Sequence, residues 1–236
     1  MAGPVREELR LRMFELFARH YEDVTFEVFA RDLAEKEHVI LLRDDAGTLR
    51  GFTTVRTYDL QIGGEPLRLL FSGDTIIEEG WWGDQALGRA WCELAGSIRA
   101  QSPLPLHWLL LSKGHRTYLY LPFFFHEFFP RHDAPTPLRE RAIIDAFASA
   151  KYGSEYDARR GIVAFANPPG RLREDLAGVG EHRRRNEHVR FFLEANPRYA
   201  EGHELVCLAR LEAANLKLFA QQCFVRGMNR LLEIPA

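Results

Sequence analysis

The change in hydrophobic period near residue 85 constrains the fold most. Upstream of it, segments 38–43, 49–60 and 67–77 are apolar or alternate between apolar and polar residues, and short glycine-containing turns separate them. This pattern predicts three strands joined as hairpins. Segment 85–100 instead has its apolar residues at helical intervals, and 106–111 again predicts a strand. The order strand, helix, strand within one sheet predicts a parallel pair with a right-handed crossover.

The third predicted strand contains an unexpected interruption. Ser72, Gly73 and Asp74 are small or polar residues within an otherwise apolar run. In a sheet interior, such residues indicate a β-bulge or a close approach of the backbone. We therefore expect an α/β (α+β) fold, with helices flanking a mixed central sheet and a ligand crevice at the carboxyl ends of its strands.

The remaining segments extend this core on both sides. The predicted elements are amphipathic helices at 4–20 and 26–36, a helix at 138–151, strands at 162–166 and 205–211, and a helix at 215–227. We expect one domain over 1–236, with its core at about 5–130 and an elaborated C-terminal extension at 131–236. A domain boundary near Pro130, where the pattern becomes less regular, is the alternative.

Composition excludes several classes of protein. The chain has 236 residues, 46% of them hydrophobic and 27% charged, which is typical of a folded protein rather than a disordered one. Its net charge of -2 gives no overall positive field for a phosphate polymer, so nucleic acid is not an expected partner. No segment approaches the roughly 18 consecutive apolar residues of a membrane span. We expect a cytoplasmic protein, and the sequence does not indicate its oligomeric state.

The cysteines and histidines do not predict a metal site. Cys92, Cys207 and Cys223 are widely spaced and form no CxxC pair, which fits a reducing compartment. The pairs His126-Glu127 and His132-Asp133 do not have the spacing of a zinc site. We therefore expect no metal.

The segment from Thr75 to Ala90 combines a strand end, a tight loop with glycines and a helix start. The first backbone amides of a helix are unpaired and lie at the positive end of its dipole, so they suit a phosphate or pyrophosphate. Gly83 and Gly88 would let the main chain and a ligand approach closely. An ordinary strand-to-helix connection is the alternative.

The sequence Gly83-Asp-Gln-Ala-Leu-Gly-Arg-Ala90 resembles the coenzyme A signature of the GNAT superfamily of acyltransferases. It departs from that signature at Gly83, where Arg or Gln is usual, and at Ala86, where a glycine is usual. The order of elements over residues 5–130 also resembles the family, including a bulged fourth strand. The end of the chain, from His188 onward, resembles acyl-homoserine lactone and N-acyl amino acid synthases.

This resemblance implies an N-acyltransferase that takes an acyl group from acyl-CoA, or from the phosphopantetheine of acyl carrier protein, and passes it to a small amine. It implies Tyr120 as general acid, with Tyr118 as the runner-up. Asp74 is the candidate general base, because a carboxylate on an otherwise apolar strand can have a raised pKa, and Glu78 and Glu79 are the alternatives. The implied cofactor-binding residues are Thr75, Ile76, Ile77, Gly83, Gln85, Ala86, Leu87, Gly88 and Arg89. A catalytically silent protein of this fold that binds a thioester or a partner is the alternative.

Two further features have open interpretations. The aromatic residues Phe123-Phe124-Phe125 predict core packing or, alternatively, a pocket for an acyl chain. The basic run His182-Arg183-Arg184-Arg185 predicts a solvated loop or, alternatively, a contact with an acidic carrier protein or the 3'-phosphate of coenzyme A.

Overall fold

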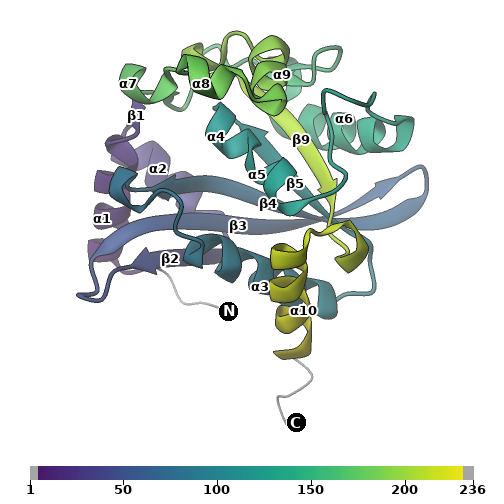
Figure 1. Ribbon diagram of the computed structural model, residues 1–236, viewed down its shortest axis with the longest axis horizontal. Helices are drawn as coiled ribbons and strands as arrows, with labels where there is room; N and C mark the ends of the chain where they lie inside the picture. Colours follow the sequence, from purple (N-terminus) through teal and green to yellow (C-terminus); the bar gives the residue numbers. More distant parts are fainter. Residues whose placement is uncertain (1–4, 231–236) are drawn as a thin grey trace.

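A computed structural model describes residues 5–230, and a seven-stranded mixed sheet forms its centre (Figure 1). The strand order is β2-β3-β4-β5-β9-β7-β6, and β4 with β5 is the parallel pair. The strands are β2 (His38–Arg43), β3 (Leu49–Ile62), β4 (Glu65–Ile77), β5 (Leu106–Ser112), β6 (Tyr156–Asp157), β7 (Ile162–Val163) and β9 (Glu204–Arg210). The predicted α/β class is confirmed, and so are the predicted strands at β2 to β5 and β9.

The hairpin between β3 and β4 turns through two residues. Gly63 and Gly64 both have positive φ, at 58° and 85°, and Ile62 pairs with Glu65 across them. Positive φ at both central residues defines the turn whose twist matches that of the flanking strands, and glycine adopts it without a steric cost. The Gly-Gly turn therefore fixes the register between β3 and β4, and with it the position of the far end of β4 relative to β3.

Helices cover both faces of the sheet. The longer ones are α1 (Glu7–Ala18), α2 (Phe26–Ala34), α3 (Ala86–Ala100), α6 (Leu138–Tyr152), α9 (Glu187–Ala195) and α10 (Leu218–Arg230). Along β4, Leu70 packs in the same cluster as α3 and α10, whereas Leu69 and Phe71 pack in the cluster of α6. This alternation follows from the two-residue period of a strand. Helices α1 and α2 cover Phe52 and Ile76 at the other end of β3 and β4.

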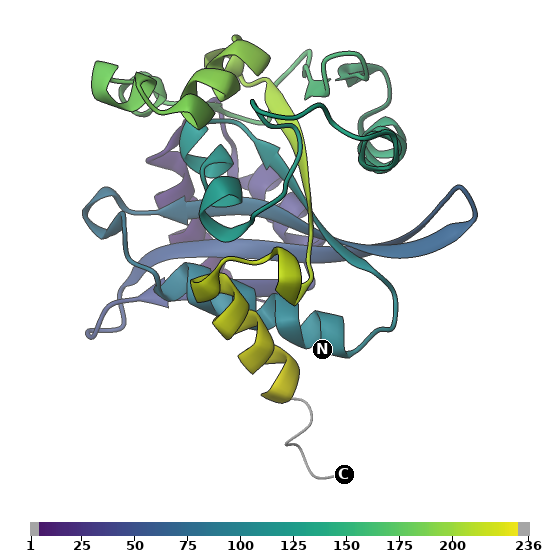
Figure 2. The same ribbon diagram turned by 45° about the vertical axis from the view of Figure 1, so that its right-hand side comes forward.

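Helices α3 and α10 cross at unusually short range, and Figure 2 shows α10 lying directly against α3. A Cβ atom added at Gly227 would lie 1.9 Å from the Glu93 carbonyl oxygen, and one added at Gly96 would lie 2.0 Å from that of Phe224. The Ser97 hydroxyl donates a 3.0 Å hydrogen bond to the Gly227 carbonyl oxygen. Two glycines, one on each helix, thus let the two backbones touch.

The parallel strands β4 and β5 part before they end. Their pairing runs from Arg68 opposite Leu106 to Ser72 opposite Leu110, and beyond Ser72 strand β4 continues to Ile77 paired with β3 alone. We call the opening between the ends of these strands the split. At its start, Gly73 and Asp74 together lie opposite the single residue Thr54 of β3. This is a β-bulge, as the sequence predicted.

Gly73 fits the bulge because it has no side chain. A Cβ atom there would lie 2.5 Å from the Thr54 hydroxyl and 2.7 Å from Cε of Lys36. We expect Gly73→Ala to lower the free energy of unfolding by about 1 to 3 kcal/mol, as in other overpacked sites. Urea titration followed by circular dichroism measures this. Gly80→Ala, where an added Cβ meets nothing within 4 Å, is the matched control; equal midpoints for the two variants would contradict this account.

After β5 the chain forms two short helices, α4 (His115–Tyr118) and α5 (Tyr120–Phe124), where the resemblance implies one. The helix is interrupted because Pro122 has no N–H to donate to the carbonyl oxygen four residues earlier, that of Tyr118. Leu119 joins the two pieces.

The C-terminal extension adds elements that the sequence did not predict. Strand β8 (Arg171–Leu172) pairs with β1 (Tyr21–Glu22), and α7 (Glu174–Ala177), α8 (Glu181–Arg184) and α9 lie together above α4 and α5 (Figure 1).

Single turns of 3-10 helix occur at η1 (Glu79–Trp81), η2 (Gly153–Glu155), η3 (Tyr199–Glu201) and η4 (Ala213–Asn215). Between residues 5 and 230, no helix has the length and apolar character required to cross a bilayer.

Candidate functional site

A cavity of about 470 Å³ opens beside the split, on the side of α3. We call it the α3 cavity. The end of β4, the loop before α3, helices α4 and α5, and the segments above them form its walls. The lining residues used below are Thr75, Ile76, Ile77, Trp82, Gly83, Asp84, Gln85, Gly88, His115, Arg116, Tyr120, Phe124, Leu176 and Arg183.

A second cavity of about 490 Å³ lies against α2, and we call it the α2 cavity. It is lined by the bulge of β4, the start of α4, the end of α6 and the segment 165–169. Tyr21, Thr75 and Thr117 line both cavities. The two cavities therefore lie back to back across the split, where a group held in one can reach a group held in the other.

Asp74 lies in the α2 cavity, and the bulge places it there. Its side chain is partly buried and makes no hydrogen bond or ion pair within residues 5–230. The nearby cations have other partners: Lys36 Nζ lies 2.6 Å from Asp32, and Lys113 Nζ lies 3.1 Å from Glu204. Asp74 is thus a carboxyl group without a fixed partner, facing an open space.

Burial raises the pKa of Asp74 to about 6, and the Asp32 carboxylate adds to the effect. Lys113 and Lys36 act in the opposite direction but do not cancel it. A carboxyl group with this pKa is mostly ionised at pH 7 and still accepts a proton readily, which is the property that a general base needs.

The two candidate tyrosines lie in different surroundings. Tyr120 lines the α3 cavity, and its ring stacks on that of Phe124 with centroids 5.7 Å apart. Burial raises the pKa of the Tyr120 phenol, so it keeps its proton at neutral pH. Tyr118 is fully buried, lines neither cavity, and donates a 2.8 Å hydrogen bond to the Pro130 carbonyl oxygen.

Six of the nine predicted cofactor-binding residues line the α3 cavity: Thr75, Ile76, Ile77, Gly83, Gln85 and Gly88. The other three, Ala86, Leu87 and Arg89, lie outside the lining set. Leu87 is buried in the core, and the Arg89 guanidinium lies 5.9 Å from the centre of the Phe219 ring. These roles were drawn from the resemblance, and they stay predictions.

The start of α3 faces the α3 cavity, and the loop before it supplies one capping carboxylate. Gln85 precedes the helix without a side-chain cap, and Asp84 accepts a 2.6 Å hydrogen bond from the Ala86 N–H. Gly83 has a φ of 96°, which only glycine adopts easily. At Gly88 a Cβ would come within 3.1 Å of Phe124 and narrow the cavity. The two glycines therefore keep the space beside the first turn of α3 open, while Asp84 bonds to the first amide of the helix.

Sequence reasoning missed several lining residues. Trp82 holds the end of β4 in place, since its indole N–H donates to the Ile77 carbonyl oxygen at 2.8 Å. His115, Arg116, Leu176 and Arg183 also line the α3 cavity, although the latter two come from the extension. The basic run 182–185 is the only sequence feature that points to Arg183 as a binding residue. The run does not indicate which of its four residues faces the cavity, and in the structure only Arg183 does.

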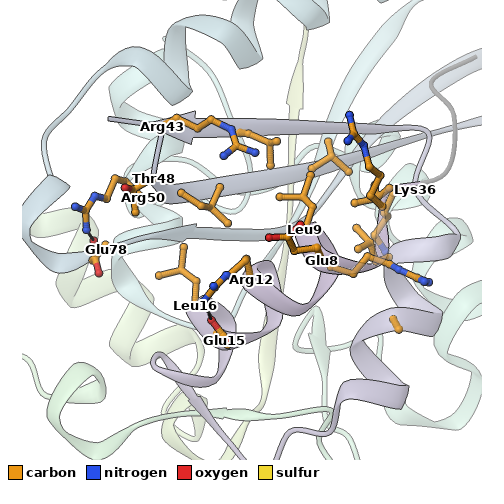
Figure 3. Close-up of a pocket in the computed structure, with 18 of the residues that line it drawn as sticks. Glu8, Leu9, Arg12, Glu15, Leu16, Lys36, Arg43, Thr48, Arg50 and Glu78 are labelled. Carbon is orange, nitrogen blue, oxygen red and sulfur yellow. Dashed lines mark hydrogen bonds and ion pairs between the residues drawn. The ribbon is translucent and has the colours of Figure 1, made fainter. Parts of the chain in front are cut away.

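A third cavity, of about 1190 Å³ and thus larger than the two at the split, lies away from it (Figure 3). It lies between α1, α2 and the edge formed by β2 and β3, with aliphatic side chains such as Leu9 and Leu16 below a charged rim. Arg12 is paired with Glu15, and Arg50 is paired with Glu78. Because Asp74, Tyr120 and the start of α3 all lie elsewhere, volume alone does not identify the site.

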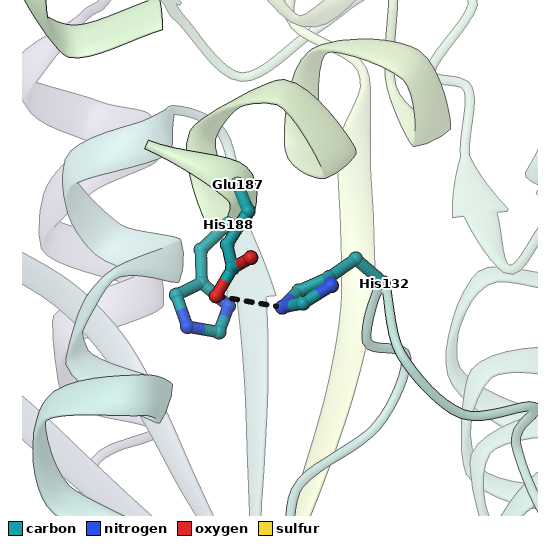
Figure 4. Close-up of side chains that lie close together, drawn as sticks. All are labelled: His132, Glu187 and His188. Carbon is teal, nitrogen blue, oxygen red and sulfur yellow. Dashed lines mark ion pairs between the residues drawn. The ribbon is translucent and has the colours of Figure 1, made fainter. Parts of the chain in front are cut away.

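A group of His132, Glu187 and His188 brings three metal-binding side chains together (Figure 4). Their ligand atoms lie within 4.8 Å of one another, and His132 Nε2 lies 3.5 Å from Glu187. In the sequence His132 stands beside Asp133, but Asp133 is paired with Arg131 and lies outside this group. Two of the three residues are exposed, and the group lies outside both cavities at the split. The cysteines Cys92, Cys207 and Cys223 are all buried and unbridged.

No family model and no curated protein matches this chain. Several solved structures are similar to part of it. One is a conserved protein of unknown function from Enterococcus faecalis V583, described as a probable N-acyltransferase (14% identity, 52% of this chain, 31% of that one, TM-score 0.41). Another is the GNAT-family N-acetyltransferase YhbS from Escherichia coli in complex with CoA (18% identity, 51% of this chain, 65% of that one, TM-score 0.37). A third is a GCN5-related N-acetyltransferase from Kribbella flavida (14% identity, 50% of this chain, 31% of that one, TM-score 0.39). The matched part is less than two thirds of each of these proteins.

Proposed function

We propose that this protein is an N-acyltransferase that moves an acyl group from a pantetheine thioester to a small amine. The observation that carries the proposal is the split between β4 and β5, which separates a cavity with the start of α3 in its wall from one with an unpaired carboxyl group. Such an arrangement keeps the donor and acceptor apart until they meet at Thr75.

The donor is proposed to lie in the α3 cavity. Beyond Ser72, strand β4 pairs only with β3, so every second residue of the segment 75–77 directs its backbone polar groups into the split. The Ile77 carbonyl oxygen is already bonded to Trp82, but the other groups can bond to a pantetheine arm, and an amide N–H there can polarise the thioester oxygen. The first-turn amides of α3 would hold the pyrophosphate of coenzyme A or the phosphate of a carrier-bound pantetheine.

The acceptor amine is proposed to enter from the α2 cavity. Asp74 takes a proton from the ammonium group, and the neutral amine attacks the thioester carbonyl carbon. A C–N bond forms, the nitrogen releases its second proton to solvent, the C–S bond breaks, and the sulfur leaves with the bonding electrons. Tyr120 then donates its phenolic proton to the thiolate and regains a proton from solvent, while Asp74 gives its proton to solvent. Asp74 and Tyr120 line one cavity each.

Thioester-dependent release of free thiol tests the proposal. The purified protein is mixed with acyl-CoA donors of increasing chain length and a panel of primary amines, and the thiol is detected colorimetrically. Release that requires both substrates supports the proposal. Failure of millimolar coenzyme A and of pantetheine to raise the melting temperature refutes it. Binding without amine-dependent release would favour the catalytically silent alternative, which the departures at Gly83 and Ala86 motivate.

The two tyrosines give opposite expected results. Tyr120→Phe removes the proposed proton donor, and we expect kcat to fall by about 100-fold with little change in melting temperature. Tyr118→Phe removes the hydrogen bond to Pro130, and we expect it to cost about 1 kcal/mol of stability and to keep kcat near that of the wild type. Steady-state kinetics and thermal melts of both variants measure this, and the reverse pattern would assign the acid to Tyr118.

A further inference from the structure

One wall of the α3 cavity carries basic and donor groups that the proposed reaction does not use. His115 is 1% exposed, and its Nε2 atom is buried without a hydrogen-bond partner within residues 5–230. Nε of Arg116 is likewise buried without a partner, while its Nη1 donates to the Leu176 carbonyl oxygen at 2.7 Å. A buried polar atom left unpaired destabilises a fold, so two of them on one cavity wall indicate a ligand that completes them.

The charges on this wall are not balanced by the protein. Arg183 lies near enough to Arg116 and His115 that its charge lowers the pKa of both, although burial is the larger cause for each. Asp84 is the one carboxylate among the residues that line this cavity, and it is bonded to the start of α3. Neither Arg116 nor Arg183 forms an ion pair in the described part of the chain, whereas most arginines near the β4 end do.

We propose that Arg116, Arg183 and His115 form a subsite for an oxyanion, a carboxylate or a phosphate, carried by the substrate in the α3 cavity. The inference rests on the proposed function in one respect, namely that a thioester occupies this cavity. A planar guanidinium binds the two oxygens of a carboxylate or phosphate side by side. The Glu79 carboxylate acts on Arg116 but does not line the cavity, so the face of the two guanidinium groups toward the cavity favours an anion.

The side chains around the subsite are arranged to hold it in place. The Arg116 guanidinium lies over the Trp82 ring, 4.5 Å from its centre, and its Nη1 donates a hydrogen bond to the Leu176 carbonyl oxygen. These two contacts hold the guanidinium in place. His115, whose pKa burial lowers to about 4, is neutral at pH 7 and can donate one N–H without adding charge. Arg183 is exposed and comes from α8, so the C-terminal extension supplies the solvent-facing part of the subsite.

The oxyanion has two sources that the chemistry alone does not separate. One is a phosphate of the donor, in addition to the pyrophosphate at α3. The other is a terminal carboxylate on the acyl group. Isothermal titration distinguishes them with two matched pairs of probes: coenzyme A against pantetheine, which lacks phosphate, and succinyl-CoA against butyryl-CoA, which lacks the carboxylate at equal chain length.

The variants are Arg183→Met and Arg116→Gln, with Arg185→Met as the matched control because Arg185 is exposed and does not line the cavity. Loss of one charged hydrogen-bond donor should weaken binding of the anionic probe by about tenfold. A phosphate source predicts this loss for coenzyme A and none for pantetheine. A carboxylate source predicts it for succinyl-CoA and none for butyryl-CoA.

A measurement without any thioester keeps the inference separate from the proposed function. Sodium succinate or inorganic phosphate should raise the melting temperature of the wild type and of Arg185→Met, and the rise should be smaller in Arg183→Met. If this holds while coenzyme A does not bind, the subsite stands and the acyltransferase proposal falls. If Arg183→Met and Arg116→Gln respond to every probe as the wild type does, the subsite is refuted.

Discussion

Replacing Asp74 by asparagine should lower kcat/KM for acyl transfer by about 10²- to 10⁴-fold, the range expected when a general base is removed. Asparagine has nearly the same shape but accepts no proton at neutral pH, so the amine must reach the thioester already deprotonated. Initial rates of thiol release at fixed donor and varied amine measure the loss. A residual rate within threefold of the wild type would show that Asp74 is not the base.

The pH profile gives a second test of the same role. Because the pKa of Asp74 is raised to about 6, the wild-type rate should rise as pH increases through about 6, where the carboxyl group loses its proton. The Asp74→Asn variant should lack this inflection. The charges that act on Asp74 come from Asp32 on α2, Lys36 just after α2, Lys113 just after β5 and Glu204 in β9. Because the Asp32 carboxylate raises the pKa of Asp74, the inflection should move toward lower pH in the Asp32→Asn variant.

The loss of activity in Asp74→Asn should not come from unfolding. A carboxyl group whose pKa is higher in the folded than in the unfolded protein contributes stability that is complete below the unfolded pKa of 3.8 and is lost as pH rises through about 6. At pH 7 the ionised Asp74 therefore destabilises the folded protein, and the Asp74→Asn variant should melt at the same or a higher temperature. Thermal melts at pH 7 check this directly.

Gly227→Ala should lower the free energy of unfolding by about 3 kcal/mol, at the upper end of the effect of overpacking. In an ordinary helix the same change is stabilising, since alanine has the higher helix propensity by about 1 kcal/mol. Here the added Cβ would lie 1.9 Å from the Glu93 carbonyl oxygen, so α10 must move away from α3. Urea unfolding followed by far-ultraviolet circular dichroism gives the change.

Asn229→Ala is the matched control, because Asn229 is exposed on the same helix and the substitution has the same product residue. It should leave stability unchanged or slightly higher. If Gly227→Ala is as stable as Asn229→Ala, the two helices do not approach as closely as the structure shows. Because α3 also begins at the α3 cavity, we expect Gly227→Ala to weaken coenzyme A binding as well.

Short sequence patterns correctly predicted the elements that are determined by residues close together in the chain. Strand β2 has the predicted bounds, β3 and β4 differ by two residues at one end, and the bulge lies at the predicted residues Gly73 and Asp74. Hairpins and a helix between two strands are encoded by period and turn residues within short windows, so one sequence suffices to find them.

The rest of the site depends on contacts between distant segments, which no local pattern encodes. Strand β9 was predicted as a strand, but its place beside β5 follows from packing. Leu176 and Arg183 reach the α3 cavity because the extension folds back over α4. The role of Tyr120 came from a resemblance and that of Asp74 from its place on an apolar strand. The structure adds that each lines a cavity at the split while Tyr118 does not.

The place of β9 between β5 and β7 has a consequence for how the protein is made. Until residue 210 has left the ribosome, one side of β5 has no neighbouring strand and its backbone groups are free to pair with another chain. About a hundred residues separate β5 from β9, which corresponds to roughly 5 to 20 seconds of translation at typical rates. The nascent chain is therefore exposed to aggregation during that interval, and binding of a chaperone to β5 before β9 emerges should increase the soluble yield.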